Sequence, residues 1–228
     1  MRILNLTPVI FLGCAVLLAE DTQKANERLD DAAALFSDVM AIPERSIPQG
    51  LLDKSQCIVV VPGLKKGAFV FGGKYGRGFV VCRGANGQGW GAPAAIRIEG
   101  GSFGLQIGFS SSDVILLVMN ERGMRAITKD KFTIGGEATA TAGPVGRDAT
   151  AQTDVMASAE ILSWSRSKGL FGGVSLDGAT LRSDKDENKL IYGKTWSTKE
   201  VLESGVQPPA ASQKLIGVLN KQSSRKSI

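Results

Sequence analysis

The sequence predicts an α+β fold: a mostly antiparallel, glycine-rich β-barrel or sandwich flanked by N- and C-terminal helices. Short apolar runs rich in β-branched residues recur through the middle of the chain, separated by glycine-containing turns. Three- and four-residue apolar spacing, typical of amphipathic helices, marks both ends. Glycine supplies 28 of 228 residues, against a usual share of roughly 7%. It follows no fixed period, which favours tight turns and closely packed strands.

The length suits one ordinary domain with small appendages. We divide the chain into an export signal at 1–19, a helical segment at 20–52, a β core at 53–195, C-terminal helices at 196–220 and a polar tail at 221–228.

The first 19 residues have the pattern of a short secretory signal peptide. A basic residue precedes an apolar run, which ends at the small residue Ala19 before Glu20. The run is too short and too closely followed by acids for a typical membrane span. We therefore expect export to the periplasm or cell envelope, with cleavage after Ala19. Acylation of Cys14 is an alternative, although the apolar residues after Cys14 argue against a lipoprotein signal.

Helical spacing covers residues 20–40, whose outer face is acidic. Pro43 ends this helix, and residues 47–52 are expected to form a short second one. Residues 184–192 are interpreted as a polar connector or a helix, and residues 198–204 and 211–220 as C-terminal helices.

Strand patterns begin at Gln56. The unbroken apolar run at 57–61 predicts a buried strand. Further strands are expected at 67–73, 78–83, 94–99, 102–109, 113–119, 161–167 and 170–182, with a short helix at 123–128. Residues 74–77 are interpreted as a hairpin turn, and 100–101 and 110–112 as connecting turns. Cys57 and Cys82 fit either a disulfide or two buried thiols.

The composition disfavours catalysis and cofactor binding. Histidine, the commonest general base and metal ligand, is absent. A phosphate-binding loop built on Gly73-Lys74 would need glycine where the chain has Ala68, and Ser or Thr where it has Tyr75. Residues 87–92 match a loose dinucleotide pattern, but Pro93 and β-type residues follow in place of a helix. We therefore expect no catalytic residues, no metal and no cofactor.

Basic residues are more informative. Between residues 60 and 100 there are six basic residues and one acid. Lysines at strand ends near aromatic residues suit an anionic phospholipid surface, although a solvated set of hairpins would look the same. The candidate lipid-binding residues are Lys65, Lys66, Lys74, Arg77, Arg166 and Lys168. Nucleic acid is not expected as a partner, because an exported protein rarely meets it.

The run Trp164-Ser-Arg-Ser-Lys-Gly-Leu-Phe-Gly-Gly-Val-Ser-Leu-Asp-Gly178 resembles the signature of the SYLF lipid-binding domain family, also described as the yeast actin-binding family domain. Trp164 stands where the family usually has Tyr. Five other segments also resemble the family and occur in the family's order along the chain: 58–63, 113–120, 135–137, 143–147 and 188–193. The resemblance extends from about Leu29 to Leu219.

This resemblance implies lipid binding, since eukaryotic members bind phosphoinositides and some fungal members also bind and bundle actin. It offers no catalytic residues. For an exported protein we expect lipid association and no actin binding; the alternative is an envelope structural or protein-interaction domain without lipid specificity. The signature glycines are interpreted as architecture that lets strands pack closely. Arg166 and Lys168 are its best functional candidates.

Overall fold

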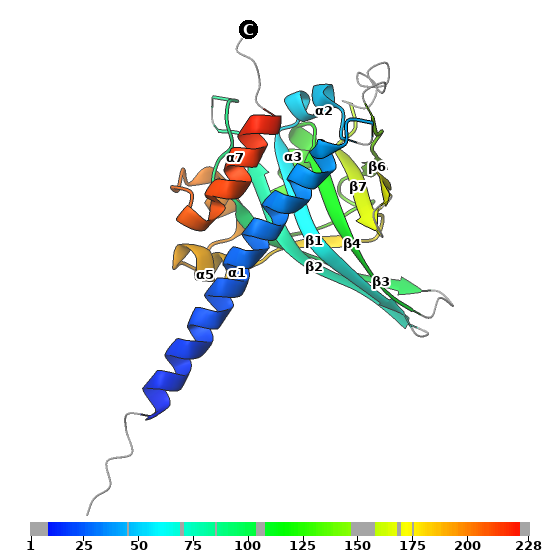
Figure 1. Ribbon diagram of the computed structural model, residues 1–228. Helices are drawn as coiled ribbons and strands as arrows, with labels where there is room; N and C mark the ends of the chain where they lie inside the picture. Colours follow the sequence, from blue (N-terminus) through cyan, green and yellow to red (C-terminus); the bar gives the residue numbers. More distant parts are fainter. Residues whose placement is uncertain are drawn as a thin grey trace, which may run out of the picture.

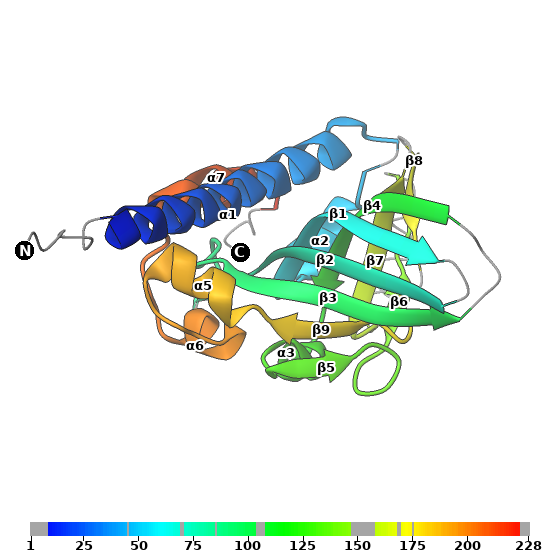
Figure 2. The ribbon, with the colours of Figure 1, turned by 90° about the horizontal axis from the view of Figure 1, so that it is seen from below.

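A long, curled β-sheet organises the protein, and helices pack against it (Figures 1 and 2). The computed structural model describes residues 9–44, 46–68, 71–84, 86–103, 108–146, 158–167, 170–174 and 176–223. The strands are β1 (Cys57–Ala68), β2 (Phe71–Cys82), β3 (Ala94–Phe103), β4 (Gly108–Val118), β5 (Lys131–Thr133), β6 (Ala140–Ala142), β7 (Ile161–Ser167), β8 (Leu170–Gly173) and β9 (Thr180–Ser183). Their order is β5-β9-β3-β2-β1-β4-β7-β6, with β8 also paired to β7.

The α+β class and the mostly antiparallel sheet are confirmed, but the closed barrel or sandwich is not. All described strand pairs are antiparallel except β6 with β7. In the part of the chain that the structure describes, the sheet curls into an open half-barrel, since its end strands β5 and β6 do not pair with each other. Helices cover its surfaces, so burial of the apolar side chains does not require closure.

The helices are α1 (Val9–Ala41), α2 (Gln49–Lys54), α3 (Glu121–Ile127), α5 (Lys185–Tyr192), α6 (Thr198–Glu203) and α7 (Gln213–Gln222), with a 3₁₀ turn η2 (Ala210–Ser212) before α7. Helix α1 crosses the sheet with α7 beside it (Figures 1 and 2). Leu29 and Phe36 of α1 are fully buried. The helix predicted at 20–40 is confirmed but starts earlier, so Ala19 lies within it. In the described part of the chain, no helix has the length and apolar character needed to cross a membrane.

Strand β1 shows why its sequence is continuously apolar. Ile58 and Val60 belong to the core under α1 and α7, whereas Val59 and Val61 belong to the core on the opposite face. A strand covered on both faces has no polar side to alternate with. The buried strand predicted at 57–61 is therefore confirmed, and it continues to Ala68.

The hairpin turn expected at residues 74–77 is wrong, because these residues lie inside the continuous strand β2. Gly78 packs against an irregularity in β1, and a Cβ atom there would lie 2.1 Å from the Val60 carbonyl oxygen. Close approach of two backbones explains this glycine.

Three further connections also differ from expectation. Residues 100–101 continue β3 and residues 110–112 continue β4, so neither segment is a turn. No single strand spans 102–109, because β3 ends at Phe103 and β4 begins at Gly108. The strand expected at 170–182 is divided into β8 and β9. The local sequence shows apolar content here but not which strands pair.

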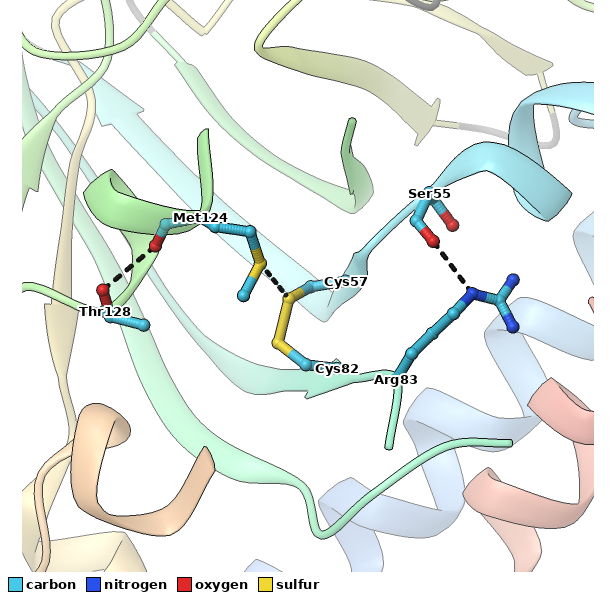
Figure 3. The surroundings of a disulfide bond; sticks show 6 residues. All are labelled: Ser55, Cys57, Cys82, Arg83, Met124 and Thr128. Atoms are coloured by element: carbon cyan, nitrogen blue, oxygen red, sulfur yellow. Dashed lines mark hydrogen bonds between the residues drawn. A yellow bond between two sulfur atoms is a disulfide. The ribbon is translucent and has the colours of Figure 1, made fainter. Parts of the chain in front are cut away.

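Cys57 and Cys82 form a disulfide between β1 and β2, which decides between the two alternatives left open above (Figure 3). Both half-cystines are buried. Met124 Sδ of α3 lies 2.9 Å from Cys57 Sγ. The bond therefore joins neighbouring strands inside the core, underneath α3.

The signature region is only partly architecture of the expected kind: Trp164 and Gly173 are closely packed, whereas Cβ atoms at Gly172 and Gly178 would meet nothing within 4 Å among the described residues, and Gly169 lies outside them. Trp164 is fully buried in β7, and its indole Nε1 donates to the Pro144 carbonyl oxygen at 2.9 Å. A Cβ atom at Gly143 would lie 2.0 Å from the Trp164 ring, and one at Gly173 would lie 2.5 Å from the Gly143 oxygen. These two family segments are therefore packed against each other, and two of their glycines provide the room.

Candidate functional site

The far ends of β1 to β4 extend beyond the rest of the sheet (Figure 1). Strand β9 pairs with β3 only over Ile96–Glu99, and β7 pairs with β4 only over Asp113–Val118. Past these points the four strands have no described outer neighbours. We call residues 65–68, 71–75, 100–103 and 108–112 the projecting tip.

Three lysines of the projecting tip lie on adjacent strands. Lys66 of β1 is directly opposite Lys74 of β2, and Lys65 is opposite Tyr75. Directly opposed residues share a face and successive residues alternate, so Lys66 and Lys74 lie on one face and Lys65 on the other. Among the residues that the structure describes, none of the three lysines forms an ion pair. Opposed like charges are destabilising, so this arrangement favours an anion nearby.

Lys74 responds to this environment. Its side chain is half-buried and lies over Gly100, where a Cβ atom would be 2.8 Å from Lys74 Cε. Burial lowers the pKa of the Lys74 ammonium group, and the charge of Lys66 lowers it further, whereas Asp177 acts in the opposite direction. An anion bound beside Lys66 and Lys74 would offset both the burial of the Lys74 ammonium group and its repulsion by Lys66.

An exposed aromatic pair accompanies the lysines. Phe109 of β4 is 96% exposed and Tyr75 is 45% exposed, unusual values for such large apolar side chains. They border a groove of about 570 Å³ that the three lysines also line. The projecting tip therefore combines positive charge with exposed apolar surface.

Arg77 adjoins the projecting tip, since its Nε donates to the Tyr75 hydroxyl at 2.9 Å, but it also faces two carboxylates. Its Nε is 3.0 Å from Asp184 Oδ2 and its Nη1 is 3.5 Å from Glu187 Oε2. Both carboxylates are buried at the start of α5. Arg28 of α1 also pairs with Glu187. This buried ion cluster, formed by Arg28, Arg77, Asp184 and Glu187, joins β2, α5 and α1.

Arg166 is likewise held in ion pairs. Its Nε is 2.8 Å from Asp113 Oδ2 and its Nη1 is 3.1 Å from Asp38 Oδ2. Asp113 also accepts a hydrogen bond from the Gly63 amide at 2.9 Å. Arg166 thus connects β7, β4 and α1. Lys168 lies outside the described residues.

Of the six predicted lipid-binding residues, the structure therefore brings together Lys65, Lys66 and Lys74. Arg77 lies at the edge of this region, next to Tyr75, and Arg166 lies elsewhere; each is held beside two carboxylates. Phe109 was missed, because residues 110–112 were interpreted as a turn that followed it. The sequence feature that could have indicated an exposed Phe109 is the run of three serines directly after it, because such a segment has little apolar surface to bury.

The comparisons with known proteins agree with the signature. Residues 99–222 match the Ysc84 family model, described as "Las17-binding protein actin regulator". The chain belongs to the SYLF (Ysc84) family. The chain is 31% identical over 208 residues to LAS seventeen-binding protein 3 of Saccharomyces cerevisiae, covering 90% of this chain and 44% of that protein.

Two further relatives, one from mouse and one from yeast, also match. SH3 domain-containing YSC84-like protein 1 of Mus musculus is 32% identical over 179 residues, which cover 78% of this chain and 52% of that protein. Protein YSC84 of Saccharomyces cerevisiae is 30% identical over 182 residues, covering 78% and 38%. The chain thus spans about half the length or less of these relatives.

These findings overturn three linked expectations. The family is described as an actin regulator, and the matched relatives are yeast and vertebrate proteins. The predictions of a signal peptide, of a secreted, periplasmic or envelope location including acylation at Cys14, and of no actin binding are therefore wrong. The apolar N-terminal run that suggested export is part of helix α1.

Proposed function

We propose that this SYLF chain is a non-enzymatic binding module that associates with anionic phospholipid surfaces through its projecting tip. The observation that carries the proposal is the set of three lysines, Lys65, Lys66 and Lys74, which have no ion pair among the described residues and lie beside the exposed Phe109. Lysines attract anionic headgroups, with about 1 kcal/mol for each residue near the surface. An exposed aromatic ring can enter the headgroup region.

Reversing the charge of Lys65 and Lys66 tests the proposal. We expect Lys65→Glu with Lys66→Glu to weaken binding to vesicles that contain phosphatidylglycerol by more than about tenfold, because two favourable contacts of about 1 kcal/mol are lost and repulsion is added. Vesicle co-sedimentation measures this. Wild-type binding should also fall as salt is raised toward 1 M, where the Debye length is about 3 Å.

The control is Lys131→Glu with Lys189→Glu, which makes the same change in net charge at exposed positions on β5 and α5. This control should bind nearly as wild type does. The Lys66→Glu substitution places a negative charge directly opposite Lys74, so the test variant should remain folded. Equal losses in both variants, or equal binding to neutral vesicles, would contradict a specific role of the projecting tip.

A second candidate function follows from the comparisons. The family is described as an actin regulator that binds Las17, so we also propose an actin-related protein partner. Filamentous actin, sedimented with the full chain in the absence of lipid, should carry the chain into the pellet. A chain that stays in the supernatant would remove this candidate for actin itself without affecting the vesicle result.

A further inference from the structure

The groove in the projecting tip has a definite construction. Gly67 of β1 is directly opposite Gly73 of β2, and the row formed by Lys65 and Tyr75 lies two residues away on the same face. Phe109 of β4 is opposite Gly67 on its other side. The two glycines thus form the floor, and Tyr75 and Phe109 border it.

The two floor glycines differ in what lies above them. A Cβ atom at Gly67 would be 2.9 Å from the Phe109 ring, so the ring rests on this glycine. Among the described residues, a Cβ atom at Gly73 would meet nothing nearer than the Gly100 carbonyl oxygen, at 4.0 Å. The space above Gly73 is therefore open, and it belongs to the groove of about 570 Å³, a volume typical of small-molecule sites.

The groove presents two kinds of chemistry to a ligand. Its aromatic borders and glycine floor offer apolar contact. Lys65 lies on the same face of the sheet as the glycine floor. Lys66 and Lys74 lie on the opposite face of β1 and β2 and add positive charge close by. A ligand that satisfies both has a hydrocarbon chain attached to an anionic head.

We propose that the groove holds one acyl chain of an anionic phospholipid, with the headgroup beside Lys65. This inference rests on the proposed function and goes further, because charge attraction alone needs no groove. The open space above Gly73 receives the chain between Tyr75 and Phe109. The phospholipid is then held individually as well as by its surface charge.

Filling the groove tests this directly. Gly73→Leu places a side chain in the open space without a backbone clash. Gly172→Leu is the matched control, since a Cβ atom at this β8 glycine meets no described atom within 4 Å and Gly172 lies outside the groove. Neither glycine has a positive φ, so both variants should fold, which circular dichroism and thermal melting would check.

The probe is dihexanoyl phosphatidylglycerol below its critical micelle concentration, titrated into the full chain by calorimetry. We expect wild type and Gly172→Leu to bind within about twofold of each other. Gly73→Leu should bind at least about tenfold more weakly, since this factor corresponds to excluding only two methylene groups from apolar contact. Dihexanoyl phosphatidylcholine, which has no net charge, should bind more weakly to wild type than the anionic probe does.

Each result supports or overturns the inference. Equal binding by Gly73→Leu and wild type, no binding of the monomeric probe, or equal binding of the neutral lipid would overturn it. If wild type binds vesicles in a salt-sensitive manner but does not bind the monomeric probe, acyl-chain binding in the groove is overturned and the lysine-dependent function is left intact. Loss of vesicle binding altogether would overturn both.

Discussion

Replacing Arg77 by alanine should lower the free energy of unfolding by about 3 kcal/mol or more, because removal of one partner leaves buried charge uncompensated. Asp184 is 0% exposed and Glu187 is 1% exposed. Glu187 keeps Arg28 as a partner, whereas Asp184 loses its ion pair with Arg77. Urea denaturation, followed by circular dichroism, measures the change.

Arg97, which lies directly opposite Arg77 on the next strand, provides the control for Arg77→Ala. Arg97 belongs to β3 and pairs with Glu99, a partly exposed carboxylate. Arg97→Ala should cost less than about 1 kcal/mol. Arg77→Met combined with Asp184→Asn should recover part of the loss, since the asparagine oxygen can still cap α5. Similar losses for Arg77→Ala and Arg97→Ala would contradict the buried ion cluster as a stabilising element.

The loss of stability caused by Arg77→Ala should depend on pH. Burial raises the pKa of the Glu187 carboxyl, and Arg28 and Arg77 act against this rise. Removing Arg77 therefore raises that pKa further. A carboxyl group with a raised folded-state pKa contributes stability below its unfolded pKa, and this contribution is lost as pH rises through the folded pKa. The difference between wild type and Arg77→Ala should accordingly shrink toward acidic pH and be larger near neutrality.

The sequence predicts elements well where local pattern and burial coincide. The run at 57–61 is apolar because both faces of β1 are covered, and β7 has the predicted bounds at 161–167. Asp184 caps α5 at the predicted polar segment. In each case the residues that carry the signal are neighbours in the chain.

The errors arise where distant residues decide the structure. Gly76 looks like part of a turn until β1 is placed beside it, where a Cβ atom on Gly76 would lie 3.0 Å from Leu64 Cα. Arg77 and Arg166 look as basic as Lys65 and Lys66, and only the fold brings carboxylates from α1, β4 and α5 to them. Local charge density therefore identified the basic region. It could not separate the lysines of the projecting tip from the arginines whose ion pairs join elements of the fold.

The disulfide carries the other large expected effect. Cys57 and Cys82 are separated by 25 residues, and closing a loop of this size restricts the unfolded chain by an amount equivalent to about 3 kcal/mol. Reduction of the wild type by dithiothreitol should lower the free energy of unfolding by about this value, measured by urea denaturation in a Cys14→Ala background that prevents exchange with the third cysteine. Reduced wild type keeps both sulfur atoms in the core, so it isolates the covalent bond from packing.

Cys57→Ala with Cys82→Ala should lose somewhat more stability than reduction alone, because it also removes the sulfur that contacts Met124. Dithiothreitol should have no effect on this double variant. Equal stability of oxidised and reduced wild type would contradict the expected contribution of the bond. The bond joins β1 and β2 at the ends opposite to Lys66 and Lys74, and both strands run on to the projecting tip. Reduction that lowers global stability while leaving vesicle binding unchanged would show that pairing along the rest of the two strands is enough to hold the lysines in register.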